Sequence, residues 1–324
     1  TDAYEHTVET AQQAESLGFE RFWVAEHHGM AETLAGTTPE VLLGHLAART
    51  GSIRLGSGAV LLNHYSPFKV AEQFGALDAL APGRIDAGLG RANGSPAADR
   101  ALETSRRVQN PDEDHAEKIE AVATHLYDEY PESHAYSDLE LPRSGDAPPV
   151  PWVLGSSPSS AAIAARLGLR FCFAAFIRPE LAVQSFETYR EQFQPSDLGG
   201  GIDEPEGIVA VNAICADSDE DAARLRAVAE ATYKRMQRGV VGTRPSVEAA
   251  IDELGGSPEP TPATLDGGEW PRAISGSPET ISGLFDQLAD RVGVGEVMIQ
   301  HVADGHATAL RSHELIADGV GLDR

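Results

Sequence analysis

The feature that most constrains the fold is a repeated pattern in which a short apolar segment ends in polar residues and a helical segment follows. Two of the apolar segments, residues 19–25 and 84–89, lead into Glu26-His27-His28 and, past a glycine, into Arg91. In a parallel α/β protein buried strands are short apolar runs, and the residues past their carboxyl ends face the ligand. The pattern therefore predicts a parallel α/β fold with these polar residues at its ligand-binding edge.

The pattern recurs along the whole chain of 324 residues. Repeated strand–helix units without a break in composition predict a single α/β domain over residues 1–324, a TIM-like (β/α)8 barrel. Segments near 130–149 and 236–275 are interpreted as insertions, since they are poorly periodic. Seven strands are found and the chain opens in a helical segment, so we expect the first strand before Tyr4, missing from this sequence. The strands are predicted near residues 20, 54, 85, 152, 170, 208 and 297, and the main helices near 4–17, 39–49, 67–80, 111–129, 179–193, 278–292 and 306–318.

The charge balance excludes two classes of partner. The chain carries 50 acidic and 25 basic side chains, a formal net charge of -25, which repels nucleic acid and anionic membranes. Lysine occurs only at Lys69, Lys118 and Lys234, and excess carboxylate with little lysine suggests a halophilic protein. No segment is typical of a membrane span or a signal peptide, so we expect a cytoplasmic protein. Cys172 and Cys215 lie in apolar runs and are expected to be free buried thiols.

Glu26-His27-His28 is the first candidate for catalysis. Histidine titrates near neutral pH, so His27 at a strand end could donate or accept a proton, with Glu26 orienting it. The alternative is a histidine that only bonds a neighbouring backbone group. A metal site built from Glu26, His27, His45 and His64 is a further alternative, although no metal-binding spacing supports it. We therefore expect no metal.

A phosphate-binding site is the second candidate. Arg91 follows a Gly-x-Gly strand end, and Ser156-Ser157-Pro158-Ser159-Ser160 combines hydroxyl groups with the start of a helix. Arginine can bind a phosphate through two N–H groups, and a helix start offers free backbone N–H groups. The simpler alternatives are a surface salt bridge for Arg91 and plain helix capping by one serine. Glycines in Gly56-Ser57-Gly58-Ala59 indicate a broken strand where the backbone approaches a flat ligand.

Asp86 is predicted to be structural. It lies inside a strand, two residues after Arg84, and at this spacing both side chains face the same side of the strand. We therefore expect an internal ion pair rather than a catalytic acid. Asn63-His64, which follows the strand near residue 54, is expected at the rim of the pocket.

Taken together, these segments resemble the bacterial luciferase-like monooxygenases, also described as luciferase-like flavin-dependent oxidoreductases. Several motifs carry the resemblance in the same order along the chain, which makes it far more specific than any single motif. It is strong from about residue 11 to 176 and weaker to about residue 301. The matching stretches are FWVAEHH at 22–28, PEVLLGHLAA at 39–48, IRLGSGAV at 53–60, VAEQF at 70–74, PGRIDAGLGR at 82–91 and LGSS at 154–157.

The resemblance implies a barrel that binds reduced FMN at the carboxyl ends of its strands. By motif position, Arg91 would hold the flavin phosphate with Ser157 and Ser160, and Ser156 lies in the same loop. The Gly58-Ala59 bond would be a non-proline cis peptide beside the flavin ring. His27 would be the active-site histidine. Family members act on a small organic substrate with O2, and a separate flavin reductase commonly supplies the reduced flavin.

Two other functions remain open at this point. A sister branch of the family uses the deazaflavin F420 for hydride transfer, and the same phosphate and cis-peptide regions would serve it. A non-catalytic flavin-binding paralogue is the other alternative, because Ala174-Ala175-Phe176 stands where relatives often carry a histidine. Gly90 replaces the reactive cysteine of true luciferases, so light emission is not implied. The family also implies a homo-oligomer, with the helix 67–80 as the face of a dimer.

Overall fold

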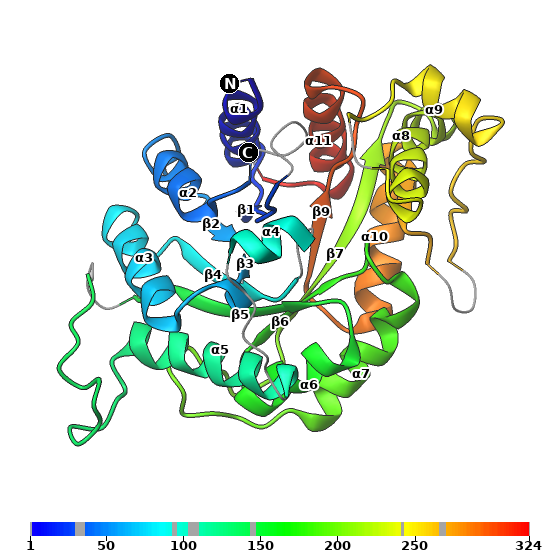
Figure 1. The fold of residues 1–324 in the computed structure, drawn as a ribbon. Helices are drawn as coiled ribbons and strands as arrows, with labels where there is room; N and C mark the ends of the chain where they lie inside the picture. Colours follow the sequence, from blue (N-terminus) through cyan, green and yellow to red (C-terminus); the bar gives the residue numbers. More distant parts are fainter. Residues whose placement is uncertain are drawn as a thin grey trace. The chain divides into compact units, whose positions relative to one another are not determined.

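The structure is a computed structural model, and its described part forms two compact units (Figure 1). Unit 1 comprises residues 1–19, 174–183 and 208–324, and unit 2 comprises residues 20–173 and 184–207. The structure describes residues 2–29, 36–92, 96–102, 110–142, 147–240, 243–265 and 270–323.

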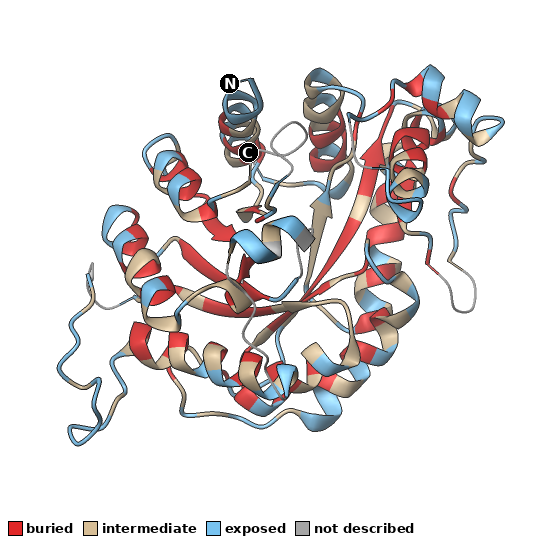
Figure 2. Ribbon diagram, viewed as in Figure 1, coloured by how far each residue is buried: buried red, intermediate tan, exposed pale blue. Residues whose placement is uncertain are grey.

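Unit 2 is built on a parallel sheet in the order β1-β2-β4-β5-β6, with the short β3 paired to the end of β4. All of β4 and the middle of β5 are buried, as Figure 2 shows, because helices and neighbouring strands cover them. Since all the strands are parallel, their carboxyl ends meet at one edge, where ligands bind in such sheets. The strands are β1 (Arg21–Val24), β2 (Arg54–Ser57), β3 (Val60–Leu61), β4 (Ile85–Gly90), β5 (Val150–Gly155) and β6 (Arg170–Ala174).

The helices of unit 2 pack beside one another in chain order, α2 on α3, α3 on α5 and α5 on α6 (Figure 1). Each presents an apolar stripe to the sheet; in α3 the stripe is Val70, Phe74 and Leu77, at the spacing of one helical face. Proline in the first turn starts several of them, where its missing N–H costs nothing. The helices are α2 (Pro39–Ala47), the 3-10 helix η1 (Leu62–His64), α3 (Pro67–Leu80), α4 (Pro96–Ala101), α5 (Pro111–Tyr127), α6 (Pro158–Leu167) and α7 (Ala182–Gln192).

Unit 1 is organised around the long strand β7. Its first half pairs with β9 and its second half with β8, both in parallel. The backbone N–H of Cys215, the last residue of β7, donates to Ser312 Oγ at 2.8 Å and so ties the strand to α11. The elements are α1 (Asp2–Ser16), the 3-10 helix η2 (Pro179–Leu181), β7 (Gly207–Cys215), α8 (Asp219–Gln237), α9 (Val247–Leu254), β8 (Ala273–Gly276), α10 (Pro278–Val292), β9 (Glu296–Gln300) and α11 (His306–Val320).

The segment 236–275, in which the sequence predicted no helix or strand, contains regular structure. Helix α9 and strand β8 both lie in this segment. Ala250 of α9 is buried against Ala227 and Ala231 of α8, and all four residues of β8 are buried. Each element is too short to show a hydrophobic period among the surrounding glycines and prolines, so the pattern alone missed them. Helix α4 was missed in the same way.

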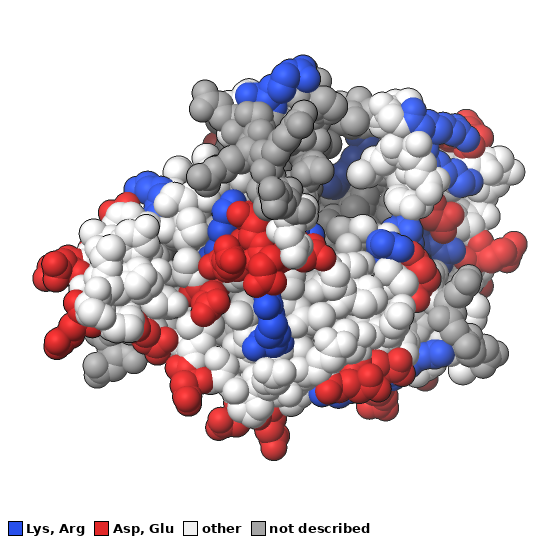
Figure 3. Space-filling model, turned by 60° about the horizontal axis from the view of Figure 1, so that its bottom comes forward, with Lys and Arg blue, Asp and Glu red and all other residues white. Residues whose placement is uncertain are grey.

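Three other expectations concern the chain as a whole. Cys172 and Cys215 are free and buried, as predicted, and burial raises the pKa of the Cys215 thiol to about 12. Among the described residues, no helix is both long enough and apolar enough to cross a bilayer. Acidic side chains are spread over the surface in Figure 3, in keeping with the net charge of -25.

Candidate active site

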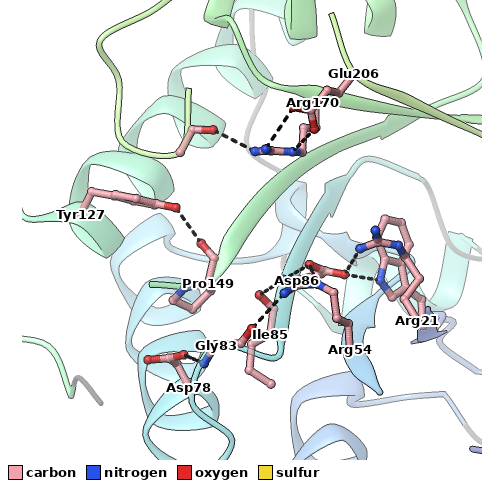
Figure 4. Close-up of polar contacts among 12 residues, drawn as sticks. Arg21, Arg54, Asp78, Gly83, Ile85, Asp86, Tyr127, Pro149, Arg170 and Glu206 are labelled. Carbon is pink, nitrogen blue, oxygen red and sulfur yellow. Dashed lines mark hydrogen bonds and ion pairs between the residues drawn. The ribbon is translucent and has the colours of Figure 1, made fainter. Parts of the chain in front are cut away.

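A buried carboxylate fixes the strands beneath the candidate site (Figure 4). Asp86, the second residue of β4, is fully buried and accepts from Arg21 Nη1 at 2.7 Å and from Arg54 Nη2 at 2.5 Å. The indole N–H of Trp23 also donates to it, at 3.0 Å. The prediction of an internal ion pair is confirmed, but the expected partner Arg84 was wrong. Arg84 instead donates to the backbone carbonyls of Ala47, Thr50 and Ile53 and to the Thr50 hydroxyl.

Above this carboxylate, small residues bring the backbones of β2, β3 and β4 close together. The Gly58-Ala59 peptide bond is cis, as predicted. A Cβ added to Gly90 would lie 2.8 Å from the Cβ of Ala59, and one added to Gly88 would overlap the carbonyl of Ser57. These glycines leave bare backbone at the carboxyl ends of the strands, which suits a flat ring lying against them.

Glu26 joins the end of β1 to the segment after β3. Its carboxylate is buried and accepts from the backbone N–H of Leu61 at 2.7 Å and from the Tyr65 hydroxyl at 2.5 Å. His28 Nε2 lies 2.5 Å from the same carboxylate oxygen that Tyr65 contacts. Burial, followed by the hydrogen bond to Glu26, raises the pKa of the Tyr65 phenol. The expected orienting bond from Glu26 therefore goes to His28 rather than to His27.

His27 is exposed, and its backbone N–H donates to the carbonyl of Gly36 at 2.6 Å. Within the described ranges, no hydrogen bond is made by its ring. Burial of the ring by surrounding protein lowers the pKa of His27, while the charge of Glu26 raises it and His28 lowers it. A neutral imidazole with a free edge can either donate or accept a proton.

Arg91 is held at the start of helix α5. Its guanidinium donates to the carbonyl of Pro111 and to Asp112 Oδ1, both at 2.5 Å. The hydrogen bond from Arg91 lowers the pKa of the Asp112 carboxyl, and the Ser159 hydroxyl lowers it further. Asp112 and Ser159, at the start of α6, line one cavity. Arg91 also forms a salt bridge with Asp112, which was the simpler alternative for its role.

The serine-rich loop forms the amino terminus of α6. Ser157 is the N-cap: its Oγ accepts from the backbone N–H of Ser160 at 3.4 Å and lies 3.3 Å from Ser160 Oγ. Gly155 packs so closely on Ser160 that an added Cβ would lie 2.2 Å from its hydroxyl oxygen. Ser156 is half-buried between them. Two hydroxyls and the positive end of the helix dipole therefore lie together at the start of α6, which fits an anion.

The remaining candidates have other roles. Asn63 Nδ2 donates to the carbonyl of Ala92 at 3.1 Å, which ties the strand ends of β3 and β4. His64 packs edge-to-face on His28, with ring centroids 5.7 Å apart. Within the described ranges, no group of three histidine, cysteine, aspartate or glutamate side chains is arranged to hold a metal ion, Glu26, His27, His45 and His64 included.

Sequence reasoning missed Tyr65 and the link from Glu26 to His28. Tyr65 carries no motif, and it becomes part of the site only because η1 turns it back toward β1. Its position just after Asn63-His64 and before the helix-starting Pro67 was the available signal.

The candidate site thus combines a parallel α/β sheet, glycine-lined strand ends and a serine-capped helix start. The model of the luciferase-like monooxygenase family matches residues 1–295. The chain belongs to this family of oxidoreductases, and its fold is the TIM-like α/β barrel, as the sequence predicted.

Three relatives illustrate the similarity. N-acetyl-S-alkylcysteine monooxygenase of Bacillus subtilis is 36% identical over 323 residues, covering 98% of this chain and 93% of the relative. The oxygenase component of the flavin-dependent trigonelline monooxygenase of Acinetobacter baylyi is 28% identical over 235 residues, covering 68% of this chain and 62% of the relative. The crystal structure of apo-MsnO8 matches with a TM-score of 0.84 and 37% identity, covering 99% of this chain and 93% of that one.

Proposed function

We propose that the protein is a flavin-dependent monooxygenase that uses reduced FMN and O2 to oxidise a small organic substrate. The observation that carries the assignment of the cofactor is the bond from Arg91 to Asp112, which lines one cavity with Ser159 of α6, at the same strand edge as the Gly58-Ala59 peptide. An anion site and a bare backbone surface at one edge fit the phosphate and the ring of one flavin.

In this proposal Arg91, Ser157 and Ser160 bind the phosphate, and Ser156 supports the loop. Arg91 donates one N–H to Pro111 and one to Asp112, so the other N–H groups of the guanidinium can bind the phosphate. The Ser157 and Ser160 hydroxyls can turn toward an anion, because each bonds chiefly to the other and to the helix start. Gly58 and Ala59 would lie against the ring.

Reduced flavin supplies the two electrons needed to activate O2. His27 is the residue that we expect to move a proton at the reaction centre, because its side chain is exposed, its ring bonds no other described residue, and partial desolvation lowers its pKa. Glu26 acts indirectly, as a positioning residue. By bonding His28, Tyr65 and the Leu61 N–H, it fixes the backbone on both sides of His27.

The test is an anaerobic titration of the purified protein with reduced FMN, followed by admission of air and assay with N-acetyl-S-alkylcysteines, the compounds named for the 36% identical relative. Arg91→Met should weaken binding of reduced FMN about tenfold or more, since a charge-assisted hydrogen bond is lost. Arg166→Gln removes an exposed arginine that pairs with Glu113 on the same helices and is the matched control. Equal binding by wild type and Arg91→Met would contradict the phosphate site.

F420-dependent hydride transfer is the alternative that the same site could serve. Titration with reduced F420 separates the two, since F420 binding without reaction toward O2 would assign the hydride-transfer branch. Binding of flavin without turnover of any substrate would instead favour a non-catalytic paralogue.

We also propose two partners. A separate flavin reductase would supply reduced FMN, as the name "oxygenase component" indicates for the trigonelline enzyme. A second copy of the chain would form a homodimer through α2 and α3, where Val41 and Leu80 are 73% and 68% exposed. Sedimentation of wild type and Leu80→Glu tests the dimer.

Location and habitat follow from composition. We propose a cytoplasmic protein adapted to high salt, on the basis of its net charge of -25 and its three lysines. Activity and melting temperature should rise between low salt and molar KCl, because salt screens the repulsion among carboxylates.

A further inference from the structure

The connection from α5 to β5 begins with residues 130–142, here named the 130–142 loop (Figure 1). Most of its residues are exposed, yet it is attached to helices of unit 2 at both ends. At the far end, a Cβ added to Gly75 of α3 would lie 2.6 Å from the carbonyl oxygen of Pro142, so the two backbones are close. At the near end, rings of the loop pack on His125, in the last turn of α5. A segment with little buried surface therefore depends on a few contacts for its position.

His125 lies among aromatic rings from three elements. Phe68, in the first turn of α3, packs on it with ring centroids 5.2 Å apart. Tyr130 and Tyr136 of the loop pack on it at 4.7 and 5.8 Å. His134 then stacks on Tyr130, with centroids 4.4 Å apart and planes at 19°. These contacts join the end of α5 to the start of α3 and to the loop.

Two histidines of this ring cluster are placed so that a proton would disturb it. The backbone N–H of Tyr136 donates to His134 Nδ1 at 3.2 Å. A protonated imidazole carries a hydrogen on both nitrogens and has no acceptor, so protonation of His134 ends this bond. The side chain of His125 is buried, and burial, followed by the charge of His134, lowers the pKa of His125. A charge on one imidazole therefore disfavours a charge on the other.

The other groups at the cluster do not change charge near neutral pH. Burial, followed by Tyr136 and Glu120, raises the pKa of the Tyr130 phenol, so Tyr130 stays neutral. From α3 the cluster receives the uncharged ring of Phe68. The titratable or charged side chains of the three elements are Tyr130, His134 and Tyr136 in the loop, Glu120 on α5, and Lys69 and Glu72 on α3, which pair with each other at 3.3 Å.

We propose that the 130–142 loop is a pH-sensitive clasp, in which protonation of His125 and His134 separates the loop from α3 and α5. Below about pH 6.5, where an unperturbed histidine becomes charged, water solvates that charge better in the open loop than the ring cluster does in the closed one. Opening also releases Phe68, which lies three residues after Tyr65. Acid would thus loosen the start of α3 beside the candidate site. The inference is independent of the proposed function, because it concerns only how the loop is attached.

The test is hydrogen exchange followed by NMR at pH 7.5 and 5.5, with each rate corrected for the intrinsic effect of pH; it requires neither flavin nor substrate. Protection of the loop amides should fall about tenfold between these values, as expected when one histidine binds a proton near pH 6.5 in the open loop and not in the closed one. Amides of β4 should remain far better protected at both pH values, because the clasp opens without unfolding the sheet. The reporting amides are those of His134, Tyr136, Ser137 and Leu139, all hydrogen-bonded in the closed loop.

Two substitutions remove the titrating groups while keeping the closed contacts. His125→Phe leaves a ring against Phe68, and His134→Asn leaves an oxygen that can accept from the Tyr136 N–H. Each variant that retains loop protection at pH 7.5 should show a smaller fall at pH 5.5, and the double variant should show a change of less than about twofold. In the wild type, the Hε1 resonance of His125 should titrate below about pH 6.5, over the range in which the loop opens.

His45→Gln is the matched control, since His45 is an exposed histidine on α2 of the same unit. This variant should keep the tenfold fall. The clasp is refuted if loop protection in the wild type does not change between pH 7.5 and 5.5, or if the double variant shows the same fall as the wild type. Equal protection of the loop and β4 amides would also overturn the inference, because the opening would then be global unfolding.

Discussion

Replacing Asp86 by asparagine should destabilise the protein far more than its small change in shape suggests. Asp86 is fully buried and is the counter-ion of two arginines, Arg21 and Arg54, besides accepting from the Trp23 indole. Asparagine retains one oxygen, but it loses the charge and turns an amide N–H2 toward groups that are themselves donors. The variant therefore removes the carboxylate that both guanidinium groups contact.

The contacts set the size of the effect. Removing one partner of a buried ion pair costs about 3–5 kcal/mol of folding free energy, because a buried charge is left uncompensated. The side chains of Arg21 and Arg54 keep 12% and 22% of their exposure, so water can solvate them in part. We expect a loss near the lower end, about 3 kcal/mol.

Urea unfolding followed by tryptophan fluorescence and by circular dichroism measures this loss. Two of the three tryptophans, Trp23 and Trp152, lie beside Asp86 and its arginines, so the fluorescence reports on this region. Glu206→Gln is the matched control: Glu206 pairs with Arg170 at 2.7 Å but is 53% exposed, and exposed pairs contribute about 0–1 kcal/mol. Equal losses for the two variants would refute the reasoning that burial makes Asp86 costly to replace.

Three further predictions test other parts of the molecule. Ser157→Ala should lower the free energy of unfolding by about 1 kcal/mol through loss of the α6 cap, and it should also weaken binding of reduced FMN. Ser218→Ala removes the equivalent cap of α8, so it should cost the same stability and leave flavin affinity unchanged in titration. Gly90→Ala should destabilise the protein by about 1–3 kcal/mol in urea unfolding, because the added Cβ would meet Ala59. Gly283→Ala in α10 has open space around it and should stabilise the protein by roughly 0.5–1 kcal/mol. The opposite order would contradict the close approach of the strands. Burial, and then the charge of Arg91, lower the pKa of His115 to about 4, so the unfolded chain binds the extra proton before the folded protein does. The free energy of unfolding should therefore fall as the pH drops from about 6.5 to 4. His115→Gln should remove about 2 kcal/mol of the loss between pH 7 and 5, and an unchanged pH profile would refute this.

The strands and helices that the sequence predicted are those in which burial follows a clear period. Helices α3 and α10 begin at a proline and end as expected, because capping residues and apolar spacing agree there. Helix α9 and strand β8 were missed because eight and four residues are too few to show a period. Their stability comes from packing on α8 and β7, which only the folded chain reveals.

Local geometry was predictable where a single strand end or a single helix start determines it. Arg91, Ser157 and the Gly58-Ala59 bond belong to this group, since each is set by its local backbone. Pairings across elements were not predictable. Asp86 pairs with Arg21 and Arg54, which reach it from neighbouring strands, and not with Arg84, which is nearer in the sequence. Adjacency in sequence does not show which strands are neighbours.

The same distinction bears on how the active site works. Adjacency suggested that Glu26 orients His27, but both oxygens of Glu26 are already used by His28, Tyr65 and the Leu61 N–H. Because these three groups hold the carboxylate, it can fix the loop without taking a proton from His27. His27 is thereby free to exchange its proton with a ligand. Glu26→Gln should therefore disturb the position of the loop and raise KM for the substrate, whereas His27→Gln should lower kcat and remove the pH dependence assigned to the imidazole. If Glu26→Gln instead shifted the pH profile of kcat as His27→Gln does, the carboxylate would have to be part of the proton transfer itself.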